Sequence, residues 1–238
     1  MNNRIGAIVL AGGRGSRMNS DVRKQYMLLE GRPLITYALD AFEASQVDEI
    51  VLVTGENEQA YVKTEIIKKY GYSKISAVVA GGEERYHSVY AGLLALHDCG
   101  HVLIHDGARP LVTDDIISRA AEGARTYQAC VVGMPVKDTI KVADMDQFGI
   151  ATPNREQLWQ IQTPQAFSYE LICRAYEWLM GHKECQKGIT DDAMVLEKYS
   201  GQPIRLIRGS YSNLKVTTPE DLVIAAALKN SLKKLKKI

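Results

Sequence analysis

The sequence predicts an α/β protein of three layers, in which helices cover both faces of a mostly parallel, Rossmann-like sheet. Two observations indicate this class: short apolar segments alternate with longer segments of helical periodicity, and some of the short segments contain continuous apolar runs, such as residues 102–104. Strands that are apolar on both sides need cover on both faces, which parallel sheets with crossover helices provide. The sequence shows no repeat and no low-complexity linker, so we expect residues 1–238 to form a single domain.

The expected elements alternate along the first half of the chain. Strands are predicted at residues 5–10, 48–54, 75–80, 101–105 and 129–135, and helices at residues 33–44, 57–70, 84–97 and 113–127. Helix 33–44 illustrates the reasoning, because Pro33 suits the first helical position and Leu34 and Ala38 recur on one face at helical spacing.

The alternation ends after Pro135. Residues 137–160 contain two short β-prone pieces around a turn-rich centre, which predicts a β-hairpin that projects from the main body, hereafter the arm. An isolated hairpin is marginally stable in water, so we expect the arm to pack against a second subunit. Residues 168–200 return to a helical pattern, residues 203–207 suit a further strand, and a cap, a proline and an acid at residues 218–220 indicate a final helix.

Composition excludes several classes of function. The formal net charge of +1 creates no overall field that would attract nucleic acid. The apolar run at residues 5–11 is too short for a signal-peptide core or a membrane span, so no membrane partner is expected. The four cysteines show no Cys-x-x-Cys spacing, which favours free thiols and a cytoplasmic location.

A glycine-rich turn follows the first predicted strand. Residues 8–18 read IVLAGGRGSRM, and Lys24 follows. Glycines let backbone N–H groups converge on an anion, and the basic side chains neutralise its charge, so the turn predicts a nucleoside triphosphate site. A dinucleotide fingerprint would need glycine at Met18, and a Walker loop would need Gly-Lys-Ser/Thr where the chain has Gly-Ser-Arg, so neither motif is matched.

Further motifs follow in a fixed order. They are GGEER at residues 81–85 with Ser88, HDGARP at 105–110, PVKDTIK at 135–141, QTPQAF at 162–167, TDD at 190–192 and NLKVT at 213–217. With these motifs the chain resembles the nucleotidyltransferases, and most closely the 2-C-methyl-D-erythritol 4-phosphate cytidylyltransferases of the non-mevalonate isoprenoid pathway. The resemblance implies a homodimer formed through the arm, CTP and a polyol phosphate as substrates, and Mg²⁺ or another divalent cation as cofactor.

The resemblance also implies roles for individual residues. Four basic side chains match catalytic positions: Arg17 and Lys24 at the α-phosphate of CTP, and Arg155 and Lys215 at the phosphate of the acceptor. Two glycine-containing segments match the CTP site: Ala11, Gly12, Gly13 and Gly15 around the triphosphate, and Gly81, Gly82, Glu83 and Ser88 at the cytosine. Nucleotidyl transfer requires mainly that two polyanions be brought together and neutralised, which suits this set of cations.

The predicted acceptor site centres on Asp106, which ends the strand at residues 101–105, where ligands of open α/β sheets bind. Its carboxylate suits acceptor hydroxyls or Mg²⁺; the alternative role is to cap the following turn. By resemblance the other acceptor-binding residues are Arg109, Thr139, Thr163 and Thr190. His105 has no serine or cysteine partner among the motifs and is interpreted as structural.

Two alternative functions stay open at this point. Residues 10–13, 152–155 and 211–215 also resemble ribitol 5-phosphate cytidylyltransferase of teichoic-acid synthesis, which shares the fold and mechanism and differs mainly in the acceptor. The other alternative is a non-catalytic nucleotide-binding protein, because a fold does not imply a function. The presence of basic residues for a second phosphate, Arg155 and Lys215, favours a catalyst.

Overall fold

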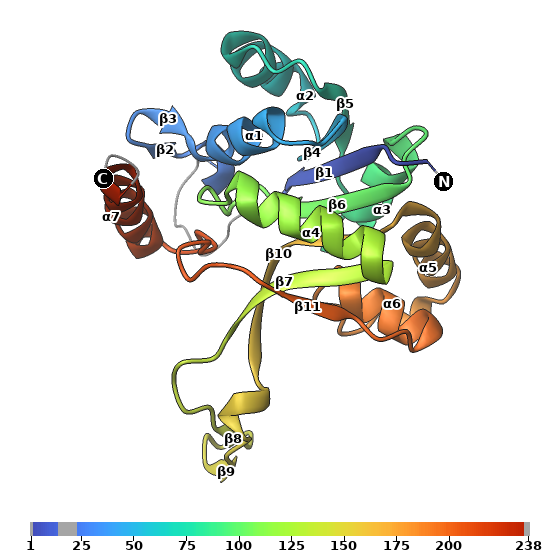
Figure 1. The fold of residues 1–238 in the computed structure, drawn as a ribbon, viewed down its shortest axis with the longest axis vertical. Helices are drawn as coiled ribbons and strands as arrows, with labels where there is room; N and C mark the ends of the chain where they lie inside the picture. The colour runs from blue at the N-terminus through green and yellow to red at the C-terminus, as the bar shows by residue number, and fades with distance from the viewer. Residues whose placement is uncertain (1, 14–22, 236–238) are drawn as a thin grey trace.

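The computed structural model describes residues 2–13 and 23–235 (Figure 1). Within them a seven-stranded sheet has the spatial order β11 (Arg205–Arg208), β7 (Ala129–Pro135), β10 (Trp159–Ser168), β6 (His101–Asp106), β1 (Ile5–Ala11), β4 (Glu49–Thr54) and β5 (Ile75–Ala80). The pairs β1–β4, β1–β6, β4–β5 and β11–β7 are parallel, whereas β10 runs antiparallel to both of its neighbours. The predicted α/β class with a mostly parallel sheet is therefore confirmed.

Helices cover both faces of this sheet (Figure 1). One face packs against α1 (Leu34–Ala44), α4 (Asp114–Tyr127), α2 (Gln59–Tyr61) and the π-helical segment η3 (Val62–Lys68), and the other against α3 (Arg85–Ala95), α5 (Tyr169–Gly181) and α6 (Asp192–Ser200). On β1, Val9 faces the first of these layers and Ile8 the second, and both are fully buried. Alternate side chains of a strand point to opposite faces, so burial on both sides accounts for the uninterrupted apolar sequence.

Most predicted boundaries shift by a few residues. Helix α1 begins at Leu34 and not at Pro33, because Pro33 pairs with Leu28 in a small hairpin of β2 (Leu28–Leu29) and β3 (Arg32–Pro33). The final helix is confirmed as α7 (Pro219–Leu235), whose first turn is held by Asp221 accepting hydrogen bonds from the backbone of Thr217 and Thr218.

The sequence did not predict β10 as a strand of the central sheet. Its residues 165–168 pair with β6 and its two ends pair with β7, with a register shift between Ile161 and Gln165. The segment QTPQAF mixes polar residues and a proline and so shows neither apolar continuity nor alternation. The predicted arm, residues 137–160, therefore ends two residues inside β10, which begins at Trp159.

The predicted helical stretch 168–200 is also wrong in part, because two helices form there. Helix α5 ends at Gly181, the short 3-10 helix η5 (Lys183–Cys185) follows, and α6 begins at Asp192. The break has a local cause: Asp191 accepts a hydrogen bond from the backbone of Met194, 3.0 Å away, and so caps a new helix.

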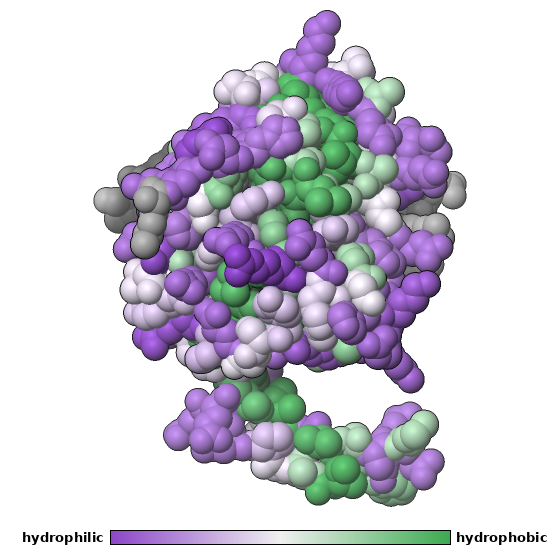
Figure 2. All heavy atoms as spheres, turned by 90° about the vertical axis from the view of Figure 1, so that its right-hand side faces the viewer, coloured by the Kyte–Doolittle hydropathy of each residue, from purple (hydrophilic) through white to green (hydrophobic). Residues whose placement is uncertain are grey.

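The arm projects from the body between β7 and β10 (Figure 1). It contains the short antiparallel strands β8 (Val142–Ala143) and β9 (Gly149–Ala151) and the 3-10 helix η4 (Arg155–Gln157). Residues 137–157 are exposed apart from Pro153, and apolar atoms lie on the arm's surface (Figure 2). Met145 and Phe148, with 100% and 71% of their surface exposed, contribute almost nothing to the core of this subunit.

The C-terminal helix α7 packs against the β2–β3 hairpin. Lys229 forms an ion pair with Glu30 and lies over the ring of Tyr37, 4.5 Å from its centroid. Among the described residues, no helix is long and apolar enough to cross a bilayer.

Candidate functional site

The candidate site lies at the carboxyl ends of the parallel strands. Asp106 is the last residue of β6 and is paired with Leu10 of β1. The glycine turn at residues 11–13 therefore begins directly beside Asp106, as expected for ligand sites of open α/β sheets.

Two glycine segments approach the end of β4 from either side. A Cβ atom on Gly12 would lie 3.2 Å from the carbonyl oxygen of Thr54, and one on Gly81 would lie 3.3 Å from the same oxygen. The backbone N–H of Gly81 donates to that oxygen over 2.7 Å. Any larger residue would push the two segments apart, so the glycines account for their close approach.

The second segment leads into helix α3. The hydroxyl of Ser88 accepts a hydrogen bond from the backbone N–H of Gly82 at 3.2 Å, and Glu84 caps the helix together with His87. These contacts bring Gly81, Gly82 and Ser88 together, as the CTP-site prediction requires. Glu83 lies in the same turn and is exposed.

The residues after the first glycine turn are held close to it. Gln25 donates to the carbonyl oxygen of Ala11, and a Cβ on Gly13 would lie 3.9 Å from Cε of Lys24. Arg23 donates to the carbonyl of Gly12 at 3.2 Å and forms an ion pair with Glu58. The structure thus places Lys24 beside the turn; Gly15 and Arg17 lie outside the described residues.

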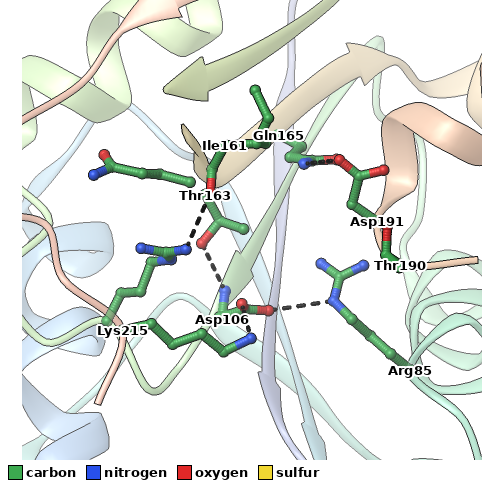
Figure 3. Close-up of a pocket in the computed structure, with 10 residues that line it drawn as sticks. Arg85, Asp106, Ile161, Thr163, Gln165, Thr190, Asp191 and Lys215 are labelled. Atoms are coloured by element: carbon green, nitrogen blue, oxygen red, sulfur yellow. Dashed lines mark hydrogen bonds and ion pairs between the residues drawn. The ribbon is translucent and has the colours of Figure 1, made fainter. Parts of the chain in front are cut away.

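Next to this turn a cavity of about 280 Å³ opens around Asp106 (Figure 3). It is lined by Arg85, Asp106, Arg109, Ile161, Gln162, Thr163, Gln165, Thr190, Asp191 and Lys215. The structure therefore brings together five residues predicted for the acceptor: Asp106, Arg109, Thr163, Thr190 and Lys215.

Asp106 is held as a carboxylate between two cations. Its Oδ2 is 2.7 Å from Nζ of Lys215, and its Oδ1 is 3.3 Å from Nε of Arg85. Burial by itself would raise the pKa of Asp106, but Arg85, Lys215 and Arg109 outweigh it and hold that pKa well below the usual range. The pocket thus presents an ionised acceptor of hydrogen bonds, surrounded by positive charge.

Arg109 is fixed by backbone oxygens. It donates to the carbonyl of Asn213 at 2.8 Å and to that of Ile161 at 3.5 Å, while its Nε has no partner among the described residues. Burial lowers the pKa of Arg109, although the guanidinium stays charged at neutral pH. Its contact with Asn213 also tethers the loop that carries Lys215.

His105 has a structural role, as its interpretation from the sequence requires. The carbonyl of Arg109 can only accept a hydrogen bond, so Nε2 of His105, 3.3 Å away, carries the proton and donates to it. In the neutral ring Nδ1 is then an acceptor, and the hydroxyl of Thr163 donates to it over 3.0 Å. The same hydroxyl accepts from the backbone N–H of Asp106, also at 3.0 Å. Burial lowers the pKa of His105 to about 4, which keeps the ring neutral.

The pocket's charge network includes two residues to which the sequence assigned no specific role. Arg85 forms a bidentate ion pair with Asp192, with both nitrogen–oxygen distances 2.8 Å, and Asp192 is fully buried. Both residues stand in quoted motifs, but no local spacing shows that positions 107 residues apart meet. The TDD motif, which has more acids than a helix cap needs, was the available signal.

Arg155 and Thr139 do not line the cavity of their own chain. Arg155 lies on the arm and donates to the carbonyl of Lys137 at 3.0 Å, and Thr139 lies in the exposed segment before β8. Their predicted roles at the acceptor stay predictions.

The donor set favours a metal ion that arrives with its own ligands. Among the described residues, no three histidine, cysteine or acidic side chains gather as a metal site. Asp106, the predicted ligand, already pairs with Arg85 and Lys215. Mg²⁺ commonly binds through one or two carboxylates together with substrate phosphates, and such an ion fits this pocket better than one held by the protein alone.

Comparisons with known proteins agree on one family. The family model described as 2-C-methyl-D-erythritol 4-phosphate cytidylyltransferase matches residues 5–231. Relatives of that name from Lachnospira eligens and Lachnoclostridium phytofermentans are 51% and 48% identical, over 92% and 94% of this chain and 96% of each relative.

Solved structures agree as well. The crystal structure of 4-diphosphocytidyl-2C-methyl-D-erythritol synthase from Anaerococcus prevotii has a TM-score of 0.84 at 33% identity, covering 95% of this chain and 96% of its own. The cytidylyltransferase from Thermus thermophilus has a TM-score of 0.76 at 27% identity, covering 94% and 98%.

The depressed pKa of His105 predicts a pH-dependent stability. The unfolded chain binds a proton near pH 6.5 and the folded chain only near pH 4, so stability is lost as pH falls through that interval. The loss amounts to about 3 kcal/mol at most. In His105→Gln the free energy of unfolding, from urea titrations at pH 4.5 to 8, should vary less with pH than in the wild type. An equally steep dependence in the variant would contradict the neutral, buried role.

Proposed function

The chain belongs to the 2-C-methyl-D-erythritol 4-phosphate cytidylyltransferase family, and we propose that it carries out that family's reaction at the cavity around Asp106. The enzyme transfers a cytidylyl group from CTP to the phosphate of methylerythritol 4-phosphate and releases pyrophosphate, in the non-mevalonate route to isoprenoid precursors. The observation that carries the placement is the position of Asp106, which lies beside the glycine turn and also lines the cavity.

We propose that CTP binds along the ends of β1, β4 and β5. The segments at residues 11–13 and 81–82 converge there on the end of β4, and Ser88 adds a hydroxyl. Lys24 lies beside Gly13, where it can reach the triphosphate. Backbone donors bind phosphate oxygens without a charge of their own, and lysine supplies the neutralising charge.

The acceptor has two kinds of polar group, hydroxyls and a phosphate, and the cavity offers a match for each. The ionised carboxylate of Asp106 accepts hydrogen bonds from the hydroxyls. Lys215 and Arg109 supply the positive charge that the phosphate needs, and Thr163 and Thr190 line the wall. A phosphate monoester is itself a competent nucleophile, so this site has no need of a strong general base.

We propose that the reaction is driven by alignment and charge neutralisation. The acceptor's phosphate oxygen attacks the α-phosphorus of CTP, the bond to the bridging oxygen breaks, and pyrophosphate leaves with the electron pair. Lys24 and Arg17 are placed by resemblance at the α-phosphate, where charge develops. When bound, Mg²⁺ supplies further charge neutralisation on the triphosphate, and Asp106 is the protein's candidate ligand.

We further propose that the enzyme works as a homodimer in which the arm reaches the partner. The arm exposes Ile140, Val142, Met145, Phe148 and Ile150, an apolar surface without cover in its own subunit. Arg155 lies on this arm and outside its own cavity, so a role at the partner's acceptor site fits its position. The four free cysteines fit a reducing compartment, and we propose the cytoplasm.

The first test of this proposal is the choice of acceptor. With CTP and Mg²⁺, pyrophosphate release should depend on added methylerythritol 4-phosphate. Ribitol 5-phosphate should be at least about 100-fold less efficient, because its chain is one carbon longer and cannot place its phosphate and its hydroxyls against the same polar groups. Chelator should abolish turnover, and excess Mg²⁺ should restore it. Asp106→Asn should lower kcat/KM for the acceptor, whereas Asp115→Asn, a surface change on α4, serves as the matched control. Ribitol 5-phosphate turning over as fast would contradict the assigned acceptor.

Lys24 and Arg17 should act on turnover more than on binding. In Lys24→Ala and Arg17→Ala we expect kcat to fall by about 100- to 1000-fold, because a donor that acts mainly on the developing charge contributes to the transition state. CTP affinity, measured by calorimetric titration, should change only a few-fold. Lys63→Ala, an exposed lysine of η3, is the control. Weak CTP binding at normal kcat would reduce both residues to affinity contacts.

The arm's role is tested by mixing two inactive variants. If Arg155 serves the partner, a dimer of Arg155→Ala and Lys24→Ala subunits has one intact site, which combines its own Lys24 with the neighbour's Arg155. Random exchange makes half of the dimers mixed, so activity should recover to roughly a quarter of the wild-type value if the sites act independently. Tagged subunits verify that exchange has occurred. Complete exchange without recovered activity would place Arg155 in its own subunit's site.

A further inference from the structure

Arg85 belongs to both halves of the proposed site. It is the first residue of α3 and directly follows the segment at residues 81–84 on the nucleotide side. Its side chain points toward the acceptor cavity, where Nε reaches Oδ1 of Asp106 at 3.3 Å (Figure 3). The orientation of this guanidinium therefore decides how Asp106 is presented to the acceptor.

A buried carboxylate sets that orientation from behind. Asp192 accepts from both terminal nitrogens of Arg85 at 2.8 Å, and its side chain has no exposed surface. The hydroxyl of Tyr176, also fully buried, donates to Oδ1 of Asp192 at 2.6 Å. Gln165 accepts from the backbone N–H groups of Asp192 and Ala193 at 3.0 Å each, which fixes the start of α6.

We propose that Asp192 is a positioning residue for cytidylyl transfer: its bidentate pair fixes the guanidinium of Arg85, so that Arg85 touches Asp106 through Nε alone. The inference rests on the proposed site. A planar guanidinium prefers a bidentate contact with a carboxylate. Without Asp192, the two terminal nitrogens of Arg85 are released and turn to Asp106. This new contact draws the carboxylate oxygens of Asp106 away from Lys215 and from the acceptor's hydroxyls.

This arrangement predicts a specific kinetic pattern. The affected oxygens are those that receive the acceptor, and the nucleotide cradle at residues 11–13 makes no contact with Asp192. Loss of the Asp192 charge should therefore raise KM for methylerythritol 4-phosphate more than it lowers kcat, and leave CTP affinity nearly unchanged. A role in folding alone would change the melting temperature and the amount of active enzyme, but not the KM of one substrate.

The test is a double-mutant cycle on the full-length enzyme. Asp192→Asn keeps the shape of the side chain and removes its charge; we expect kcat/KM for the acceptor to fall on the order of 10- to 100-fold, the range of a charged hydrogen bond. In an Arg85→Met background the same change should have almost no further effect, because Asp192 acts through Arg85. Asp115→Asn, which breaks an exposed ion pair with Arg119, is the matched control.

The possible results distinguish a failure of this inference from a failure of the proposed site. Equal losses from Asp192→Asn in both backgrounds, or an unchanged KM in a folded variant, would overturn it. If Asp192→Asn does not fold, Tyr176→Phe provides the test, because it removes a single hydrogen bond to Asp192. We expect it to lower kcat/KM for the acceptor a few-fold, and to have no such effect in the Arg85→Met background. Full activity in Lys215→Met and Asp106→Asn would instead refute the proposed site.

Discussion

A buried carboxylate at the end of a central strand must have its charge balanced, and the surroundings of Asp106 meet that requirement. An unpaired buried ion is costly, whereas one that is paired and hydrogen-bonded is tolerated. Lys215 comes from the loop before α7 and Arg85 from α3, so the carboxylate joins segments far apart in the sequence. Removing either cation would leave Asp106 with a single direct ionic partner, in the cavity proposed to receive a second anion. The same charges that stabilise the fold here are those that a phosphorylated substrate needs.

The sequence predicted the site best where a residue is tied to a strand end or a turn. Asp106, Gly12 and Gly81 follow strands, and the fold class alone brings such positions to one edge of the sheet. Lys215 was found through resemblance, and the structure places it 2.7 Å from Asp106. The pair of Arg85 and Asp192 could not be predicted in this way, because their contact depends on how α5 packs against both α3 and α6. No local pattern encodes the packing of separate helices.

The fold, like the site, has elements that the sequence predicts and elements that it does not. Strands such as β1 and β4 have continuous apolar centres and were predicted almost to the residue, because burial on both faces selects for such sequences. In β10 several polar side chains serve the site, and Gln165 and Thr163 hold neighbouring backbone groups instead of filling a core. A strand that contributes to a polar cavity loses the alternation by which strands are found. The functional use of β10 is thus the physical reason why it was missed.

Strands β7 and β10 are neighbours in the sheet, and the arm is the chain that connects them. In topological terms it is a long connection at the tip of a hairpin. Extra length there costs little loop-closure entropy, on the order of 0.6 kcal/mol for each doubling, and leaves the strand register unchanged. Selection can therefore alter the arm's length and its apolar tip without rebuilding the sheet. If the arm joins two subunits as proposed, a lineage that carries two copies of such a gene has, in this one connection, a means of keeping their products from mixing.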